Sequence, residues 1–174
     1  MDYQTIDVAG IVRESITDGP GIRYTLFVQG CPHCCQGCQN QQTWEFGAGT
    51  KLTVDQIFEE ILKNPLLSGV TFSGGEPFCQ AKELIPLAEK IKEKGMELAI
   101  YTGYTAEELL EEADADRLRL LALADIVIDG RFELDKKSYE LKFRGSSNQR
   151  TIDGRETARQ GKVVLNTGDR WNQT

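Results

Sequence analysis

The sequence predicts an α/β protein, a single domain over residues 1–174 that forms a partial (β/α) barrel with a mainly parallel sheet. Short apolar segments alternate with helical segments along the chain, and this alternation is typical of crossovers between parallel strands. The apolar segments are nearly uninterrupted, as in strands that are buried on both faces. A complete eight-unit barrel takes about 250 residues. A chain of 174 residues therefore has room only for an incomplete barrel or a short open sheet.

The expected strands are runs of β-branched, aromatic and aliphatic residues, most of which end at a glycine. They fall at 22–30, 69–72, 97–103, 124–130 and 161–166. Because the carboxyl ends of parallel strands collect the chemistry in such folds, the segments that follow these strands are the first candidates for a functional site.

The expected helices lie between the strands. Thr53, followed by Gln56, is a capping-box pattern that predicts a helix over 54–64. Residues 81–95 place apolar side chains on one helical face, and the glycine at 95 is expected to end that helix. A second capping box, Thr105 with Glu108, predicts an acidic helix before the strand at 124–130.

Composition and charge exclude several classes of protein. No window approaches the roughly 18 apolar residues of a membrane helix, and the N-terminus lacks the basic start and apolar run of a secretory signal. The formal net charge of −7 argues against a general nucleic-acid binder or a protein of anionic membranes. We therefore expect a cytoplasmic protein.

The charge is unevenly distributed. Residues 1–130 carry 10 basic and 21 acidic side chains, whereas the C-terminal segment 131–174 carries 10 basic and 6 acidic ones. This basic segment is either a docking surface for another protein or an ordinary solvated face.

Four of the five cysteines lie within the eight residues CPHCCQGC at 31–38, and Cys79 stands apart. Thiols so close together cannot join distant segments, which argues against a disulfide framework. Cys31, Cys35 and Cys38 have the spacing C-x3-C-x2-C, which suits an iron–sulfur cluster with one iron free of protein ligands. On spacing alone a zinc site, or no metal at all, remains open.

The spacing C-x3-C-x2-C after the first expected strand, together with GGEP (74–77) after the next, resembles the radical S-adenosylmethionine (SAM) superfamily. The segment DGPGIRYTLFVQGC (18–31) is similar to the opening of its glycyl-radical-enzyme activases. Further segments resemble the activating proteins of anaerobic ribonucleoside-triphosphate reductase: CQNQQTW (38–44), SGVTFSGGEP (68–77), YTGY (101–104), IVIDGRF (126–132) and KFRGSSNQR (142–150). The resemblance runs from about Asp18 to Asp153.

The resemblance implies an oxidoreductase with two cofactors, a [4Fe–4S] cluster on Cys31, Cys35 and Cys38 and SAM on the open iron. One electron from the cluster then splits SAM into methionine and a 5′-deoxyadenosyl radical, which takes a hydrogen atom from a glycine of the partner reductase. A flavodoxin or ferredoxin would supply the electron. The alternatives are an activase of another glycyl-radical enzyme, such as pyruvate formate-lyase, an iron–sulfur electron carrier, and a zinc-stabilised interaction module.

The cofactors carry the hard chemistry, so no catalytic side chain is expected. The resemblance implies these cofactor-binding residues: Gly37, Gly74, Gly75, Glu76, Pro77, Asp129 and Arg131. The two adjacent glycines would let the backbone approach SAM, and Glu76 would accept from the SAM ammonium group. A plain strand-ending turn is the alternative for this segment.

The resemblance implies further assignments at the strand ends. Arg131 suits the SAM carboxylate and Asp129 a polar group or ion, with an Asp-Gly turn beside a surface arginine as the alternative. Gly37 stands where many members have an aromatic residue near adenine, so it could offer only backbone contacts. The segment YTGY lacks the acidic residue that related activases use for a cation. KFRGSSNQR is the candidate contact with the reductase.

Several other residues have competing interpretations. His33 is expected to be an ordinary loop residue and Cys79 a small buried residue. Cys34 is either a bystander or a thiol that confuses the choice of ligand when the cluster is damaged. Three aromatic residues either line the substrate approach or pack in the core: Trp44, Phe46 and Tyr104. The turn Asp18–Gly21 either lies at the far end of the barrel or flanks its mouth.

Overall fold

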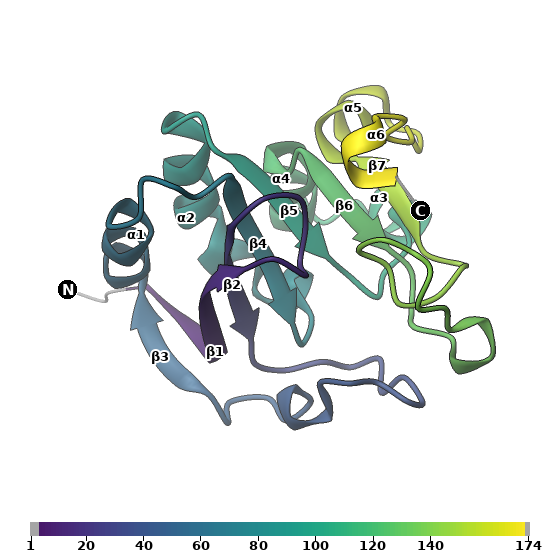
Figure 1. Ribbon diagram of the computed structural model, residues 1–174, viewed down its shortest axis with the longest axis horizontal. Helices are drawn as coiled ribbons and strands as arrows, with labels where there is room; N and C mark the ends of the chain where they lie inside the picture. The colour runs from purple at the N-terminus through teal and green to yellow at the C-terminus, as the bar shows by residue number, and fades with distance from the viewer. Residues whose placement is uncertain (1–3, 173–174) are drawn as a thin grey trace.

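The computed structural model describes residues 4–172, so residues 1–3 and 173–174 of the predicted domain lie outside the described part (Figure 1). Seven strands form one sheet in the order β3-β1-β2-β4-β5-β6-β7. The strands are β1 (Thr5–Ser15), β2 (Arg23–Val28), β3 (Thr50–Thr53), β4 (Gly69–Gly74), β5 (Glu97–Tyr101), β6 (Ile126–Asp129) and β7 (Arg150–Asp153). The helices are α1 (Val54–Leu62), α2 (Ala81–Glu93), α3 (Ala106–Glu112), α4 (Ala115–Leu123), α5 (Gly154–Gln160) and α6 (Asp169–Asn172).

The centre of the sheet confirms the predicted class. Strands β2, β4, β5 and β6 run parallel, and the helical crossovers between them were expected from the sequence. The outer strands β1, β3 and β7 pair antiparallel and were not predicted. Because β3 and β7 lie at opposite edges without pairing to each other, the barrel is incomplete.

The prediction of a strand at 161–166 is wrong. Gly161 adopts the left-handed conformation that ends α5, and the following residues meet the edge of the sheet through one bridge between Leu165 and Ile152. The last strand is β7 instead, whose four residues precede α5.

The predicted helix signals are confirmed. Both capping boxes form, at Thr53 for α1 and at Thr105 for α3. Gly95 follows α2 with a φ of +75°, a conformation that glycine adopts without strain. The acidic helix after Thr105 is divided in two, because Ala113 turns into the left-handed region between α3 and α4.

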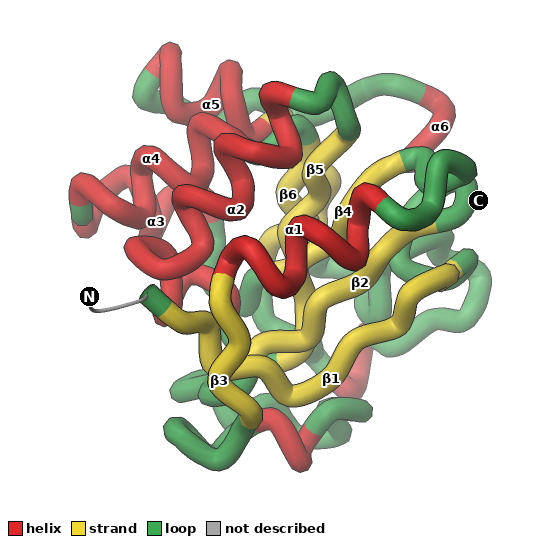
Figure 2. The backbone as a smooth tube through the Cα atoms, turned by 90° about the vertical axis from the view of Figure 1, so that its left-hand side faces the viewer, coloured by secondary structure: helices red, strands yellow, loops and turns green. Residues whose placement is uncertain are grey.

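The helices cover the outer face of the sheet (Figure 2). The apolar face of α2 is fully buried at Leu84, Leu87, Ala88 and Ile91. It packs in one cluster with alternate residues of the central strands, among them Phe72 and Ile100. Each such side chain contributes about 1.5–3 kcal/mol when removed from water, so this layer holds the strand ends in a fixed arrangement.

The inner face of the sheet is covered by irregular chain rather than by long helices. The loop 16–22 crosses in front of the strands, and α6 lies near β6 and β7 (Figure 1). Here Ile126 and Ile128 form a second cluster with Trp171 of α6, and Phe143 packs against it. The central strands are thus buried on both faces, as their apolar composition predicts.

Within residues 4–172, no helix has both the length and the apolar character needed to cross a bilayer.

Candidate functional site

Four loops meet at the carboxyl edge of the parallel strands: the cysteine loop (31–38) after β2, the GGEP segment after β4, YTGY after β5 and the Asp-Gly-Arg turn after β6. Backbone hydrogen bonds join them in pairs. The N–H of Glu76 donates to the carbonyl of Gly30 at 2.8 Å, and the N–H of Gly130 donates to the carbonyl of Tyr104 at 3.1 Å. The expectation that the unusual segments gather at one edge is confirmed.

The cysteine loop carries free thiols. Cys31, Cys35 and Cys38 are half-buried, while Cys34 is exposed and has a φ of +50°. Burial raises the pKa of Cys31 to about 11, and burial also raises that of Cys35. A metal that takes these two sulfurs as thiolates therefore displaces a proton from each.

The donor set fits an iron–sulfur cluster, because three of the four free thiols in this short loop have the spacing C-x3-C-x2-C. The side chains do not converge, however. Among residues 4–172, no three His, Cys, Asp or Glu side chains lie close enough together to hold a metal ion. The assignment of Cys31, Cys35 and Cys38 as ligands therefore stays a prediction.

Glu76 is the most enclosed polar residue at this edge, with a side chain that is 0% exposed. Its Oε1 accepts from the N–H of Gly103 at 2.7 Å and its Oε2 from the N–H of Phe78 at 3.0 Å, while the Thr102 hydroxyl lies within 2.9 Å of both oxygens. His33 Nε2 also lies 2.7 Å from Oε1. Both oxygens are thus occupied by the chain itself, and the predicted contact with an ammonium group stays a prediction.

Gly74 and Gly75 are explained by backbone packing. A Cβ on Gly74 would lie 2.6 Å from the backbone nitrogen of Val28, and Gly74 has a φ of +97°. A Cβ on Gly75 would lie 2.4 Å from the carbonyl oxygen of Gly30. Pro77 then opens a 3-10 turn that Glu76 caps. The two glycines therefore let the end of β4 approach the strand that leads into the cysteine loop.

Gly75→Ala is expected to lower the free energy of unfolding by about 1–3 kcal/mol, because the added methyl group meets backbone that cannot rotate away. Gly10→Ala is the matched control, since a Cβ there meets nothing within 4 Å and the φ of Gly10 is not in the left-handed region. It is expected to leave stability unchanged or slightly raised. Urea denaturation of both variants measures the difference, and equal midpoints would contradict the packing explanation.

Asp129 and Arg131 are both engaged by their own chain. Asp129 is buried and accepts from the N–H of Ala106 at 2.9 Å and from Arg150 at 2.6 Å. Arg131 forms a two-bond pair with Glu108 at 2.9 and 3.1 Å, and this pairing lowers the pKa of Glu108 to about 2. Contact of either residue with SAM stays a prediction.

The segment KFRGSSNQR (142–150) folds back on the Asp-Gly-Arg turn. Gln149 accepts from the N–H of Gly145 and donates to the carbonyl of Gly130, and Asn148 donates to the carbonyl of Arg131. The polar side chains of Asn148 and Gln149 thus stabilise the connection between β6 and β7. Its contact with a partner protein stays a prediction.

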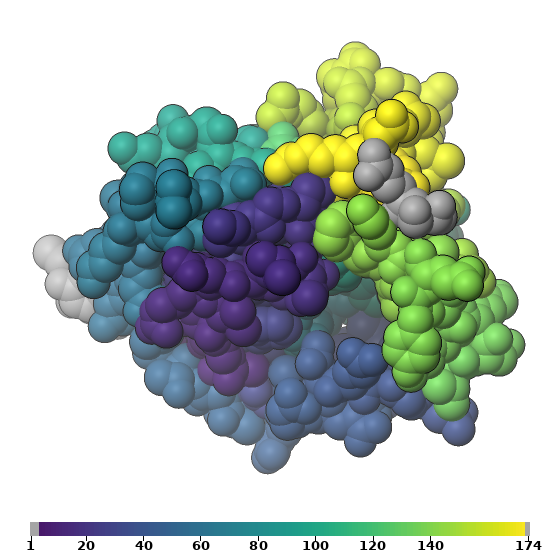
Figure 3. All heavy atoms as spheres, in the orientation of Figure 1, coloured from purple at the N-terminus to yellow at the C-terminus, as the bar shows by residue number. Residues whose placement is uncertain are grey.

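A cavity of about 540 Å³ opens on the inner face beside the cysteine loop. Its lining includes Cys38, Ser73, Tyr101 and Asp18, with side chains of the segment 132–149 on the other side. Figure 3 shows a hollow where the purple N-terminal loop, the blue cysteine loop and the green segment meet. Ser73 and Tyr101 were not among the predicted site residues, although their position near or at the ends of strands could have indicated them.

The position of the turn Asp18–Gly21 is also settled. Asp18 lines this cavity, whereas Gly21 packs against Ser68, which precedes β4 at the opposite end of the strands. The turn therefore crosses the inner face, from the mouth of the partial barrel to its far end, so both predicted positions apply.

The three aromatic candidates lie elsewhere. Tyr104 packs edge-on against His33, Phe46 covers Gly30, and Trp44 is half-buried beside the cysteine loop. None of them lines the cavity. Cys79 is half-buried, with its sulfur 3.9 Å from the hydroxyl of Tyr104.

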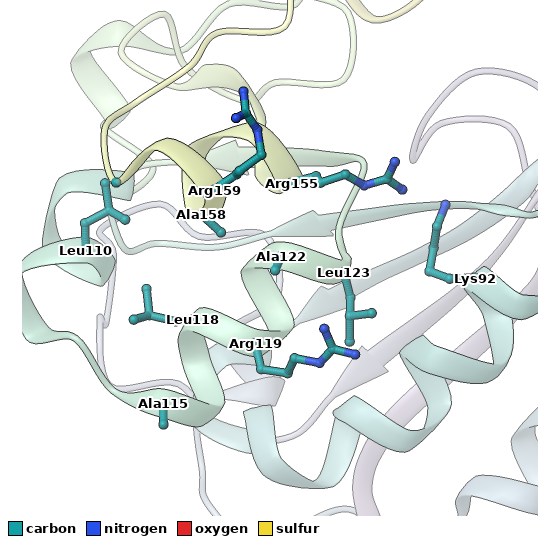
Figure 4. Close-up of a pocket in the computed structure, with 11 residues that line it drawn as sticks. Lys92, Leu110, Ala115, Leu118, Arg119, Ala122, Leu123, Arg155, Ala158 and Arg159 are labelled. Carbon is teal, nitrogen blue, oxygen red and sulfur yellow. The ribbon is translucent and has the colours of Figure 1, made fainter.

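A larger groove of about 910 Å³ lies on the outer helical layer, with α4 and α5 along it (Figure 4). Its floor includes Leu118 and Ala122, and Arg119 and Arg159 lie at its sides. It contains none of the predicted site residues, so the cavity beside Cys38 is the better candidate for the functional site.

Comparison with known proteins agrees with the cysteine pattern. A family model described as a 4Fe-4S single cluster domain matches residues 17–152. The QueE crystal structure from Escherichia coli is similar with a TM-score of 0.49 and 18% identity, over 59% of this chain and just over half, 56%, of that chain.

Two curated relatives match along most of their length. An anaerobic ribonucleoside-triphosphate reductase-activating protein of Pasteurella multocida is 39% identical over 144 residues, which cover 77% of this chain and 89% of the relative. The protein of the same name from Escherichia coli K12 is 36% identical over 142 residues, which cover 77% of this chain and 90% of the relative. This chain belongs to the family of anaerobic ribonucleoside-triphosphate reductase-activating proteins.

Proposed function

We propose that this protein is a radical SAM activase that installs a glycyl radical on anaerobic ribonucleoside-triphosphate reductase. The observation that carries the proposal is the match to activating proteins over about nine-tenths of their length. The match to a 4Fe-4S single cluster domain over residues 17–152, which contain the whole cysteine loop, supports the cofactor assignment.

Cys31, Cys35 and Cys38 hold the cluster in this proposal, and SAM binds in the adjoining cavity. When bound, the two cofactors supply the 5′-deoxyadenosyl radical that takes a hydrogen atom from a glycine of the reductase. The chain's own part is to hold both groups at the carboxyl edge of the sheet and to exclude water from them. The half-buried cysteines and the cavity wall at Cys38 suit that task.

The SAM contacts belong to the proposal as well. Backbone groups of Gly37 and of the GGEP segment are proposed contacts at this edge. Asp129 and Arg131 would have to exchange Arg150 and Glu108 for SAM, since both are paired in the structure. We also propose that residues 1–174 act as one radical SAM domain in the cytoplasm, with a flavodoxin or ferredoxin as electron donor.

The test is anaerobic reconstitution with iron and sulfide, followed by reduction in the presence of SAM. We expect about four irons per chain and conversion of SAM to 5′-deoxyadenosine. Incubation with the anaerobic reductase should then give the EPR doublet of a glycyl radical. If the doublet forms only with pyruvate formate-lyase, the partner is that enzyme and the proposed reductase is not the substrate. A full cluster without SAM cleavage would instead contradict the enzyme and favour an electron carrier.

A further inference from the structure

His33, which the sequence suggests is an ordinary loop residue, has a buried side chain that is 5% exposed. Its Nε2 lies 2.7 Å from Oε1 of Glu76. A carboxylate oxygen only accepts, so the imidazole donates in this contact, as the tautomer with hydrogen on Nε2. A hydrogen bond from a ring nitrogen to a buried carboxylate is of the charge-assisted, stronger kind.

The imidazole ring also fits a defined slot. Tyr104 packs edge-on against it, with ring centroids 4.6 Å apart. On another side lies Gly103, where an added Cβ would come within 2.4 Å of the ring carbon Cδ2. Glycine at 103 therefore leaves the space that the ring fills. The hydrogen bond and the two packing contacts all come from segments that follow β4 and β5.

The rest of the loop tip has few such attachments. The backbone bonds of Gly30 and Cys31 hold its beginning, against Thr43 and Trp44. Across residues 4–172, the bond from His33 is the one side-chain hydrogen bond that joins residues 32–37 to the ends of β4 and β5. It lies between Cys31 and Cys35, two of the proposed cluster ligands.

We infer that His33 is a positioning residue that fixes the cysteine loop to the ends of β4 and β5 through Glu76. The inference rests on the proposed function in one respect, the assignment of Cys31 and Cys35 as ligands. The side chain of Glu76 then links the loop to the strand ends, because its two oxygens meet four donors of the chain: His33 from the loop, and Phe78, Thr102 and Gly103 from the segments that follow β4 and β5. His33 acts on the cluster only through the loop.

The decisive comparison is His33→Phe with His33→Gln. Phenylalanine keeps a flat ring in the slot but donates nothing, so Oε1 of the buried Glu76 carboxylate loses its one bond to the cysteine loop and keeps its bond to the N–H of Gly103. Glutamine places an amide N–H close to the position of Nε2 and is expected to rescue the contact. Cys34→Ser is the loop control, because that side chain is exposed.

The first measurement is hydrogen exchange of the protein before reconstitution. We expect the amides of residues 31–38 and of Gly103 to exchange about tenfold faster in His33→Phe, the factor that loss of one strong hydrogen bond gives. The glutamine and Cys34→Ser variants should stay within about twofold of the parent protein. Amides of α2 serve as the internal reference and should be unchanged. Equally faster exchange in α2 would mean general destabilisation and overturn the inference.

The second measurement is the rate at which a chelator removes iron from the reconstituted protein. We expect about tenfold faster release from His33→Phe and near-parent rates from His33→Gln. Unchanged exchange and unchanged release in the phenylalanine variant would overturn the positioning role. If the parent protein takes up no iron at all, the proposed function fails, and the exchange measurement still decides whether His33 fixes the loop.

Discussion

Cys35→Ala is expected to leave the protein unable to retain a four-iron cluster and to lower formation of 5′-deoxyadenosine by more than about a hundredfold. Changes to residues that merely support a metal ligand already cost about 10- to 100-fold. Removal of a ligand costs more, because the cluster then loses one of the three thiolates that hold it. The measurements are iron and sulfide content after anaerobic reconstitution and the yield of 5′-deoxyadenosine. Cys31→Ala and Cys38→Ala should behave in the same way.

Cys34→Ala is the matched control, since it removes a thiol from the same loop. The Cys34 side chain is exposed, whereas the three predicted ligands are half-buried. The variant should therefore keep its iron and its rate of SAM cleavage. Loss of iron from Cys34→Ala together with retention in Cys35→Ala would show that the spacing C-x3-C-x2-C selects the wrong thiols. Zinc, rather than iron, after anaerobic purification would support the four-ligand alternative.

The sequence predicts those parts of the fold that depend on neighbouring residues. Capping boxes at Thr53 and Thr105 act over three residues, and the apolar face of α2 repeats with the helical period. The outer strands depend on distant pairing. β1 exposes residues 12–14, so no continuous run of buried residues indicates the whole strand, and one of its two partners, β3, begins only at Thr50. The strand predicted at 161–166 is not found because this apolar run pairs with β7 only around Leu165, through one bridge and the two backbone hydrogen bonds that flank it.

The candidate site shows the same division. The spacing of the cysteines and the position of GGEP after a strand are local, and the structure places both at the carboxyl edge. The partners of the predicted residues are not local. Glu76 and His33 are 43 positions apart, and Asp129 and Arg150 are 21 positions apart. A single sequence shows that such side chains are present but not that they form hydrogen bonds with one another, so the contacts of Glu76 and Asp129 with SAM stay predictions.

The other large effect concerns Arg23, whose side chain is 0% exposed on the inner face of the sheet. It donates to Thr71 at 2.8 Å, to the carbonyl of Val70 at 3.1 Å and to Glu97 at 2.8 Å. Trp171 lies over the guanidinium, 5.2 Å from its carbon to the ring centroid. Burial lowers the pKa of Arg23, and the carboxylate of Glu97 opposes that shift. Arg23 thus joins β2, β4, β5 and α6 in one buried network.

Arg23→Met is expected to lower the free energy of unfolding by about 3 kcal/mol, because a buried ion pair loses one partner and Thr71 loses a donor. For a chain of this size the melting temperature should fall by about 10 °C. Arg13→Met is the matched control: its pair with Glu60 has the same N–O distance of 2.8 Å, but the Arg13 side chain is 65% exposed. Water screens that pair, so the melting temperature of the Arg13→Met variant should equal that of the parent protein. Calorimetry on both variants separates burial from distance as the source of stability, and equal losses would contradict the role assigned to burial.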